Sequence, residues 1–504
     1  MVKVSREFAG RRVTILGLGV FSGGTSSARY FAAQGADVTV TDLQSDKELS
    51  TSIKSLSNWP IRYVLGEHRE KDIIDADLVV VNPAIKIENP FVQLAQNRGI
   101  PLTTETNLVF QLSNRPIIGI TGSNGKTTTT QLIGELLRSV YPTTLVGGNI
   151  GKSVLNELNN ESKNVALKPK FENLLDSKKS PSYTSGENDP TPLVLELSSF
   201  QLQRLSWIQK SPQLAVVTNL SPNHLDWHGS FESYEEAKRY IGLYQNDNNQ
   251  IVLNADDKQL RMWKDFCPGQ VVWFSTERTV KKGCYLHNGQ IIYRDKNDEK
   301  IVCSSRSFQL PGRHNQANLV AAVTLACLAG IPPPLIQSTV ENFKAVEHRL
   351  EKVGIINAIS YYNDSACTTP TSTVTALRAF ENPLILIAGG YDKGIDFDNM
   401  AEEINLRARA VILIGSTGDR IEQAIKKNTS YNTEVIRAKT LDEAVYVSSV
   451  IAQPKDTVLL SPGCASYDMF VNFEERGNKF KAAVIELDRK SKNNTNHKNP
   501  VAED

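Results

Sequence analysis

The sequence lacks long apolar runs and any excess of one charge. Its 504 residues carry 56 basic and 55 acidic side chains, a net charge of +1. Such a balance provides no electrostatic footprint for nucleic acid or for an anionic membrane. No apolar run approaches the ~20 residues of a membrane span, and no charged-then-apolar leader opens the chain. We therefore expect a cytoplasmic protein that acts on small molecules, with no nucleic acid and no membrane as partner. We also expect a monomer, although neither charge nor hydropathy bears on the oligomeric state.

Cysteine is scarce and unpatterned. The six cysteines, at positions 267, 284, 303, 327, 367 and 464, show neither paired nor metal-ligand spacing. This pattern is typical of free thiols in a reducing compartment, and it predicts no zinc site. The length exceeds what one hydrophobic core usually serves, so a prior of about 150 residues per domain predicts about three domains.

The stretch PIIGITGSNGKTTTTQLIGELL reads as a short apolar strand, a glycine-rich turn and an amphipathic helix. Gly122 and Gly125 allow backbone N–H groups to point at phosphate oxygens, and the positive end of the helix dipole faces the same way. Lys126 is placed to reach phosphates and Thr127 a magnesium ion. The general phosphate-loop pattern requires glycine at position 120, where Ile120 stands, so the match is incomplete. A plain glycine turn, the alternative, leaves the Lys-Thr pair unexplained.

The N-terminal segment RVTILGLG, a helix near SSARYFAAQG and the strand DVTVTD predict a βαβ unit. Gly17 and Gly19 suit close approach of a phosphate, but the next glycine is at 23 rather than 22. Asp42 ends the second strand. It could accept hydrogen bonds from a ribose or base, or it could cap a loop, and the spacing favours neither.

The central segment alternates strands with helices, and its expected strands are TTLVGGN, PLVLELSS, LAVVTNL, QIVLNADD and VVWFS. Ligands of parallel α/β sheets bind at the carboxyl ends of the strands. Glu196 ends one strand, where a buried carboxylate requires a partner and suits a magnesium ion. His224 follows another strand. Taken by itself, its position favours a loop histidine hydrogen-bonded to backbone over a metal ligand.

A third run of strands and helices begins near residue 345 and contains the glycine turn GGYDKG, in which Lys393 suits anion binding. The predicted fold class is α/β with three domains. They are residues 1–112, 113–344 with a disordered polar insertion at about 160–191, and 345–487, followed by a polar tail over 488–504.

Nine motifs in order extend this interpretation: TGSNGKTT, GGNIG, LELSSFQL, TNLSPNHLDWHG, GRHNQAN, EHR, YYNDS, GGYDKG and SPGCASYDMFVNFEERG. Together they resemble the Mur ligase family over the whole chain. TGSNGKTT also suits folylpolyglutamate synthases and other peptidoglycan ligases, whereas CASYDMFVNFEERG is similar to the branch that adds D-glutamate. The resemblance implies a Rossmann-like N-terminal domain, a phosphate-loop central domain and a Rossmann-like C-terminal domain.

The implied reaction is ATP-dependent addition of D-glutamate to UDP-N-acetylmuramoyl-L-alanine through an acyl phosphate, in peptidoglycan precursor synthesis. The resemblance implies that ATP is bound by Gly122, Ser123, Asn124, Gly125, Lys126, Thr127, Thr128, Asn318, Arg349 and Asp364. It implies catalytic roles for Lys126, Glu196, His224 and Lys238. Two magnesium ions are implied, held by Thr127, Glu196, His224 and a carbamylated Lys238.

The same resemblance assigns the two substrates to separate residues. Contacts to the uridine-linked substrate are implied for Gly17, Asp42 and Asn149. Contacts to D-glutamate are implied for Thr368, Lys393, Ser466 and Phe473. Two departures stand out: Ala366 occupies a position where the family commonly has lysine, and the turn GLGVFSGGTSSARY carries one extra residue.

Two other hypotheses stay open. A different carboxylate–amine ligase of the same superfamily would use the same phosphate loop. A nucleotide switch or dinucleotide-binding protein could also contain that loop, but its function would not require Glu196, His224 and Lys238 together. Dependence of ATP turnover on two co-substrates separates these classes.

Overall fold

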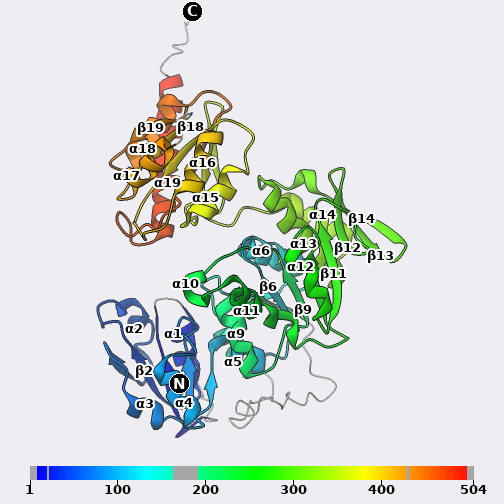
Figure 1. The fold of residues 1–504 in the computed structure, drawn as a ribbon, viewed down its shortest axis with the longest axis vertical. Helices are drawn as coiled ribbons and strands as arrows, with labels where there is room; N and C mark the ends of the chain where they lie inside the picture. Colours follow the sequence, from blue (N-terminus) through cyan, green and yellow to red (C-terminus); the bar gives the residue numbers. More distant parts are fainter. Residues whose placement is uncertain (1–7, 20–21, 163–190, 428–431, 497–504) are drawn as a thin grey trace, which may run out of the picture. The chain divides into compact units, whose positions relative to one another are not determined.

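The computed structural model describes residues 8–19, 22–162, 191–427 and 432–496. It contains three β-sheets of five, nine and six strands (Figure 1). The chain forms two compact units, one of residues 1–305 and 317–340, the other of residues 306–316 and 341–504. The first two sheets lie in the first unit and the third sheet in the second. The predicted α/β fold class is confirmed. Over the described ranges, no helix has the length and hydropathy to cross a membrane.

The first sheet is wholly parallel, with the strand order β3-β2-β1-β4-β5. Its strands are β1 (Arg12–Leu16), β2 (Asp37–Asp42), β3 (Ile61–Leu65), β4 (Leu78–Val81) and β5 (Leu102–Thr103). Its helices are α1 (Ser22–Ala33), α2 (Ser50–Ser55), α3 (Glu70–Ile74), α4 (Pro90–Asn97) and α5 (Glu105–Leu112). The βαβ start expected from the sequence is confirmed by β1, α1 and β2.

The second sheet has the order β14-β13-β12-β11-β10-β9-β6-β8-β7. The strands expected from the sequence are β6 (Ile117–Thr121), β7 (Leu145–Gly148), β8 (Leu193–Glu196), β9 (Leu214–Val217), β10 (Gln250–Asn254) and β11 (Gln270–Ser275). The helices that follow these strands are α6 (Lys126–Arg138), α7 (Leu155–Ser162), α9 (Ser199–Arg204), α10 (Leu225–His228), α11 (Phe231–Leu243) and α12 (Lys258–Met262). Helices α13 (Arg313–Leu328) and α14 (Pro333–Asn342) come after the sheet.

A hairpin extension of this sheet was not predicted. It consists of β12 (Lys282–His287), β13 (Gln290–Asp295) and β14 (Asp298–Ser304), and β13 pairs antiparallel with both neighbours. The turn between β12 and β13 has positive φ at Asn288 (50°) and at Gly289 (78°). An Asn-Gly pair between alternating apolar residues favours this two-residue hairpin, so the signal was present in the sequence.

Strand β6 lies between β8 and β9, and all five of its residues are buried. Helices α6 and α11 both contact it (Figure 1). Parallel strands covered on both faces read as continuous apolar runs, which explains the sequence IIGIT. The loop that follows β6 therefore starts from a rigid, buried strand.

The third sheet has the order β15-β16-β20-β17-β18-β19 and is parallel except for the edge strand β15. Its strands are β15 (Glu351–Ile356), β16 (Ile359–Asn363), β17 (Leu384–Ala388), β18 (Ala408–Leu413), β19 (Glu434–Arg437) and β20 (Thr457–Leu460). Its helices are α15 (Pro370–Leu377), α16 (Asp398–Arg407), α17 (Gly418–Lys426), α18 (Leu441–Ile451) and α19 (Phe473–Asn496).

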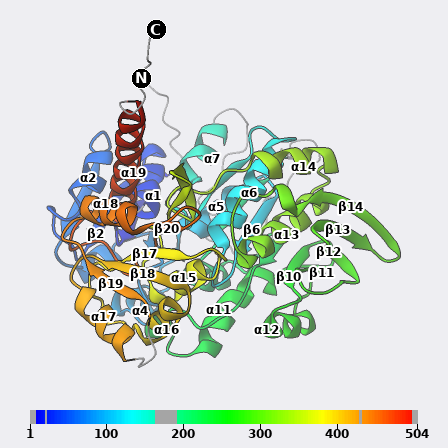
Figure 2. The same cartoon turned by 90° about the horizontal axis from the view of Figure 1, so that it is seen from above.

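Helices cover both faces of this third sheet (Figure 2). Leu384 and Leu386 of β17 belong to the core that includes residues of α15, α16 and α17. Ile385 and Ile387 belong to the core that includes residues of α18 and α19. The alternation follows from the two-residue period of a strand, and it places the loops at the carboxyl ends of the strands outside both cores.

The C-terminal helix α19 extends into the segment that the sequence predicts as a polar tail. The tail expected over residues 488–504 is helical at its start, because α19 continues to Asn496. Ion pairs four residues apart, Glu486–Lys490 and Asp488–Lys492, support this exposed extension without any apolar stripe. The insertion predicted to be disordered, at about 160–191, begins within the last residues of α7, and its residues 163–190 lie outside the described residues.

Candidate active site

The loop after β6 is shaped by its glycines. Gly122 and Gly125 have φ of 151° and 80°. A Cβ at Gly122 would lie 1.9 Å from the Thr218 hydroxyl, and one at Gly125 would lie 2.1 Å from the Asn318 side-chain oxygen. No larger residue fits at either position, so the loop wraps closely around the start of α6. This is the cradle that the sequence predicted, with Asn318 packed against it.

The segment after β9 holds the loop in place. Ser123 donates its N–H to the Asn219 carbonyl (2.9 Å) and its hydroxyl to the Ser221 carbonyl (2.8 Å). Asn124 donates its N–H to Asn219 Oδ1 (2.9 Å) and accepts a bond from the Thr218 hydroxyl (2.6 Å). Sequence reasoning missed Thr218, Asn219 and Ser221. Their polar run directly after a buried strand was the available signal.

Glu196 lies at the end of β8, beside β6, and only 2% of it is exposed. Its Oε2 accepts a hydrogen bond from Thr127 Oγ1 (2.7 Å) and its Oε1 accepts one from Asn149 Nδ2 (2.9 Å). Lys126 folds back over the loop, and its Nζ donates to the carbonyls of Gly122 and Ser123, both at 3.0 Å. The structure thus places Thr127 beside Glu196, the two residues for which the family resemblance implies a shared magnesium ion.

Lys238 is the deepest of the predicted site residues, with 1% of its surface exposed. From α11 its Nζ donates to the Gly122 carbonyl (2.9 Å) and to Thr121 Oγ1 (3.2 Å), and it lies 4.8 Å from the Tyr234 ring centroid. Burial, followed by the charge of Lys126, lowers the pKa of Lys238 well below its usual value, although Glu196 opposes the shift. Lys238 is therefore not an exposed surface lysine of α11.

His224 follows β9 in the left-handed region, with φ of 54°, and caps the short helix α10. Its ring packs edge-on against Phe200, with centroids 5.0 Å apart. Burial and then the nearby charges of Lys126 and Lys238 lower the pKa of His224 below 6.5. A neutral imidazole retains a lone pair, so this histidine is able to act as a ligand at neutral pH.

The residues of this loop fit a magnesium-bound nucleotide. The loop offers backbone N–H groups at the N-terminus of the 13-residue helix α6, together with the Lys126 ammonium group and the Thr127 hydroxyl. The end of β8 adds the Glu196 carboxylate. Among the described residues, no group of three or more His, Cys, Asp and Glu could hold a metal ion. Magnesium commonly takes one or two carboxylates and completes its shell with phosphate oxygens and water. The donor set therefore suits a phosphate-bound ion rather than a closed protein cage.

Asp42 caps a loop in this structure. Its Oδ2 accepts hydrogen bonds from the N–H groups of Leu18 (2.8 Å) and Gly19 (3.0 Å), and its Oδ1 accepts one from Gln44 (2.9 Å). Gly17 precedes this turn with φ of 85°. Of the two interpretations left open by the sequence, loop capping is confirmed. The contact of Asp42 and Gly17 with a uridine substrate stays a prediction.

In the second unit, Asp364 follows β16 and is 3% exposed. Its Oδ1 accepts a bond from the Leu350 N–H (3.1 Å) and its Oδ2 accepts one from the Ser461 hydroxyl (2.9 Å). Burial raises the pKa of Asp364 to about 6, against the opposing effects of these hydrogen bonds and of the Arg349 charge. Arg349 itself is exposed.

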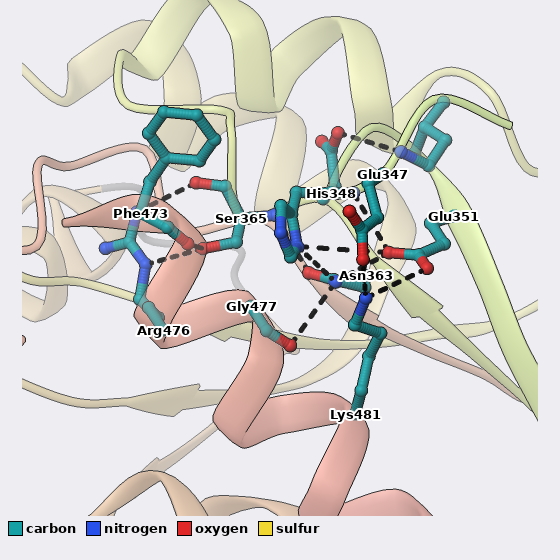
Figure 3. Close-up of polar contacts among 11 residues, drawn as sticks. Glu347, His348, Glu351, Asn363, Ser365, Phe473, Arg476, Gly477 and Lys481 are labelled. Atoms are coloured by element: carbon teal, nitrogen blue, oxygen red, sulfur yellow. Dashed lines mark hydrogen bonds and ion pairs between the residues drawn. The ribbon is translucent and has the colours of Figure 1, made fainter.

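Arg476 of α19 joins three segments of this unit (Figure 3). It is fully buried and donates to the Ser365 hydroxyl (2.9 Å), to the Ser365 carbonyl (2.9 Å) and to the carbonyls of Cys464 (3.1 Å) and Ala465 (3.3 Å). The Ser365 hydroxyl in turn donates to the Phe473 carbonyl (2.8 Å). Sequence reasoning missed this arginine, although it stands inside the FEERG motif.

A second buried network lies beside it (Figure 3). Asn363 Nδ2 lies 2.9 Å from His348 Nδ1 and donates to Glu351 Oε2 at 2.9 Å. The His348 N–H also donates to Glu351 Oε2 (2.9 Å). Since His348 precedes Arg349 and Asn363 precedes Asp364, this network fixes the backbone that carries both predicted nucleotide contacts.

The predicted D-glutamate residues follow neighbouring parallel strands. Thr368 lies after β16, Lys393 after β17, and Ser466 and Phe473 after β20. Their strands adjoin in the order β16-β20-β17, so the four residues belong to one edge of the third sheet. Ser466 is 2% exposed and Thr368 is partly exposed, whereas Lys393 is exposed. Each of these four residues thus follows the carboxyl end of a strand of the third sheet.

Three family models match this chain in order: "Mur ligase MurD-like, N-terminal domain" over residues 11–104, "Mur ligase middle domain" over 120–326, and "Mur ligase, glutamate ligase domain" over 348–464. The chain belongs to the Mur ligase family. A UDP-N-acetylmuramoylalanine–D-glutamate ligase of Roseiflexus sp. is 38% identical over 487 residues, which cover 95% of this chain and 99% of the relative. A ligase of the same name from Clostridioides difficile is 36% identical over 483 residues, covering 95% and 100%.

Solved structures share the fold at lower identity. UDP-N-acetylmuramate-alanine ligase MurC of Thermotoga maritima aligns with a TM-score of 0.56 at 19% identity, covering 94% of this chain and 99% of that one. MurF ligase of Thermotoga maritima, solved in complex with ADP, aligns with a TM-score of 0.55 at 16% identity, covering 96% and 97%. At these identities the likeness extends to the fold alone.

Proposed function

We propose that this chain catalyses the ATP-dependent addition of D-glutamate to UDP-N-acetylmuramoyl-L-alanine, with release of ADP and phosphate, as a step of peptidoglycan precursor synthesis in the cytoplasm. Near-full-length relatives of that name support the substrates. The observation that carries the chemistry is the cluster at the phosphate loop, in which Thr127 and Asn149 bond to Glu196 while Lys238 is buried under the same loop.

The reaction needs activation because a carboxylate is a poor electrophile. Transfer of the γ-phosphoryl group to the substrate carboxylate gives an acyl phosphate. The amine of D-glutamate attacks its carbonyl carbon, forms the amide bond and displaces inorganic phosphate. Phosphoryl transfer depends mostly on positioning and charge neutralisation. Lys126 and the loop N–H groups would bind the phosphates, with Ser123, Asn124, Thr128 and Asn318 shaping the nucleotide site. Magnesium neutralises charge on the phosphate oxygens when it is bound.

We further propose two magnesium ions, one on Thr127 and Glu196 and one on His224 and a carbamylated Lys238. Burial favours the neutral amine of Lys238. A neutral amine adds carbon dioxide through a new N–C bond and loses one proton, which yields a carbamate with two hard oxygens suited to magnesium. The carbamate nitrogen keeps one N–H. One of the two present bonds from Nζ therefore survives the modification.

The remaining assignments follow the same proposal. Arg349 and Asp364 would contact the nucleotide, and Thr368, Lys393, Ser466 and Phe473 would bind D-glutamate. Gly17, Asp42 and Asn149 would contact the uridine-linked substrate, and the chain would act as a monomer. A cation at Lys393 suits the carboxylates of an acidic amino acid.

One assay tests the proposal. Phosphate release is measured with ATP, magnesium, UDP-N-acetylmuramoyl-L-alanine and D-glutamate, each omitted in turn. We expect release only with the complete mixture, and none when L-glutamate replaces D-glutamate. Equal activity with L-glutamate, or release without either acid or amine, would overturn the proposal. Activity with a different acid and amine would assign the chain to another carboxylate–amine ligase.

A further inference from the structure

The glycine turn GGYDKG, which follows β17, carries Lys393 on an exposed loop with three glycines at positive φ: Gly389, Gly390 and Gly394. Glycines give such a loop many alternative conformations, and an exposed lysine has a flexible side chain. Recognition of a small acid requires the ammonium group to be held in one place. The loop therefore needs anchors outside its own backbone.

Arg420 of α17 supplies anchors on both sides of Lys393. Its Nη1 pairs with Asp392 Oδ1, and its Nη2 donates to the Ile395 carbonyl (2.8 Å). Its guanidinium also lies 5.2 Å from the Phe397 ring centroid. Asp392 Oδ1 accepts a second bond, from the Gly394 N–H (2.7 Å). The residue before Lys393 and the two residues after it are thus tied to one guanidinium group.

The other side of the loop is fixed by the segment after β20. The Tyr391 N–H donates to the Ala465 carbonyl (2.8 Å), next to Ser466. The rings of Tyr391 and Tyr467 meet edge-on with centroids 6.0 Å apart, and Lys393 Nζ lies 6.0 Å from the Tyr467 centroid. These contacts restrain the start of the turn and leave its second half to Arg420.

We propose that Arg420 is a positioning residue that holds Lys393 for recognition of the amino-acid substrate and thereby sets the KM for D-glutamate. The inference rests on the proposed function, because it takes Lys393 as a D-glutamate contact. Arg420 and Asp392 are 41% and 38% exposed, so the pair alone would contribute little to stability. The planar guanidinium group of Arg420 engages two partners at once. This geometry makes Arg420 a restraint on the loop that lysine cannot reproduce.

The test compares Arg420→Ala, Arg420→Lys and wild type in the full chain, by phosphate release at varied D-glutamate. We expect Arg420→Ala to raise the KM for D-glutamate about fivefold, as expected for loss of an exposed charged contact, while kcat and the KM for ATP stay within twofold. Arg420→Lys should recover only part of the loss, and added guanidinium ion at low millimolar concentration should lower the KM of Arg420→Ala.

The matched control is Lys427→Ala, which removes another exposed ion pair at the end of the same helix, to Asp398. It should leave the KM for D-glutamate unchanged. An equal rise in both variants, or no rise in Arg420→Ala, would overturn the positioning role. Hydrogen exchange gives an independent readout, since the amides of residues 392–395 should exchange faster in Arg420→Ala alone. If wild type releases no phosphate in response to D-glutamate, the proposed function fails, whereas unchanged exchange in Arg420→Ala counts against the positioning role itself.

Discussion

Lys238 and Lys393 are both lysines at strand-end sites, yet their surroundings are opposite. Lys238 is 1% exposed, bonded to two groups of the phosphate loop, and its pKa is driven down by burial. Lys393 is exposed on a glycine turn, and its position depends on neighbours such as Arg420. Lys238 is therefore held in place by the buried core. Lys393 is held by surface contacts, so a substitution at a neighbour such as Arg420 should have a smaller effect on activity than a substitution of Lys238.

The largest expected effect is on the buried lysine. Lys238→Ala should lower turnover about a thousandfold, because the second proposed magnesium loses its ligand. Acetate should restore part of the activity, and removal of carbon dioxide should inhibit wild type reversibly. Lys210→Ala is the control, since burial also lowers the pKa of Lys210 but it has no place in the proposed site. Near-normal activity of Lys238→Ala, or an unmodified lysine by peptide mass in active enzyme, would contradict the prediction.

Asp364 offers a pH test of burial in the second unit. Its folded-state pKa of about 6 lies above the usual 3.8, so its neutral form favours the folded state. This stabilisation is present below about pH 4 and is lost as the pH rises to about 6, a change of about 3 kcal/mol. This pH-dependent loss of stability should be absent in Asp364→Asn, because asparagine does not titrate. Urea unfolding of both proteins at pH 4.5 and 7.5 should show the difference, and parallel pH dependences would refute it.

Asn149 tests how far the phosphate-loop site depends on a side chain that orients Glu196. Asn149→Ala removes the bond to Glu196 Oε1 and should weaken magnesium activation about tenfold, as for other groups that orient a metal ligand. Varying magnesium at saturating substrates measures this. Asn156→Ala, which removes a bond from α7 to Ser26, serves as control. An unchanged magnesium requirement would mean that Thr127 alone orients the carboxylate.

The smallest expected effect comes from Ala366, which follows the buried segment 363–365 and donates its N–H to the His348 carbonyl (3.0 Å). Ala366→Lys adds a cation at a position where family members commonly have one. We expect tighter binding of D-glutamate or phosphate by about 1 kcal/mol, measured as a lower Michaelis or inhibition constant. If both constants stay the same, another cation already supplies this charge.

The sequence predicted the loop between β6 and α6 in the first unit because its signals are local. A buried strand, two glycines and a Lys-Thr pair define the loop, and strand-end logic adds Glu196. What it could not predict were contacts between distant segments. The hydrogen bond from Ser123 to Asn219 joins residues 96 positions apart in the chain, and the one from Arg476 to Ser365 joins residues 111 positions apart. The burial of Lys238 could not be predicted either. The sequence of α11 has the polarity of an ordinary surface helix, and the groups that Lys238 contacts, at Thr121 and Gly122, lie far from it in the chain.

The helix that begins at Phe473 gives the second unit a particular order of assembly. Arg476 binds the segments at Ser365 and Ala465, so these loops obtain their buried partner from residues that are made after all six strands of the third sheet. Domains form from the N-terminus onward during synthesis. The phosphate loop can therefore be complete while the other strand-end site is still open, and a chain released before residue 473 would carry the first site without the second.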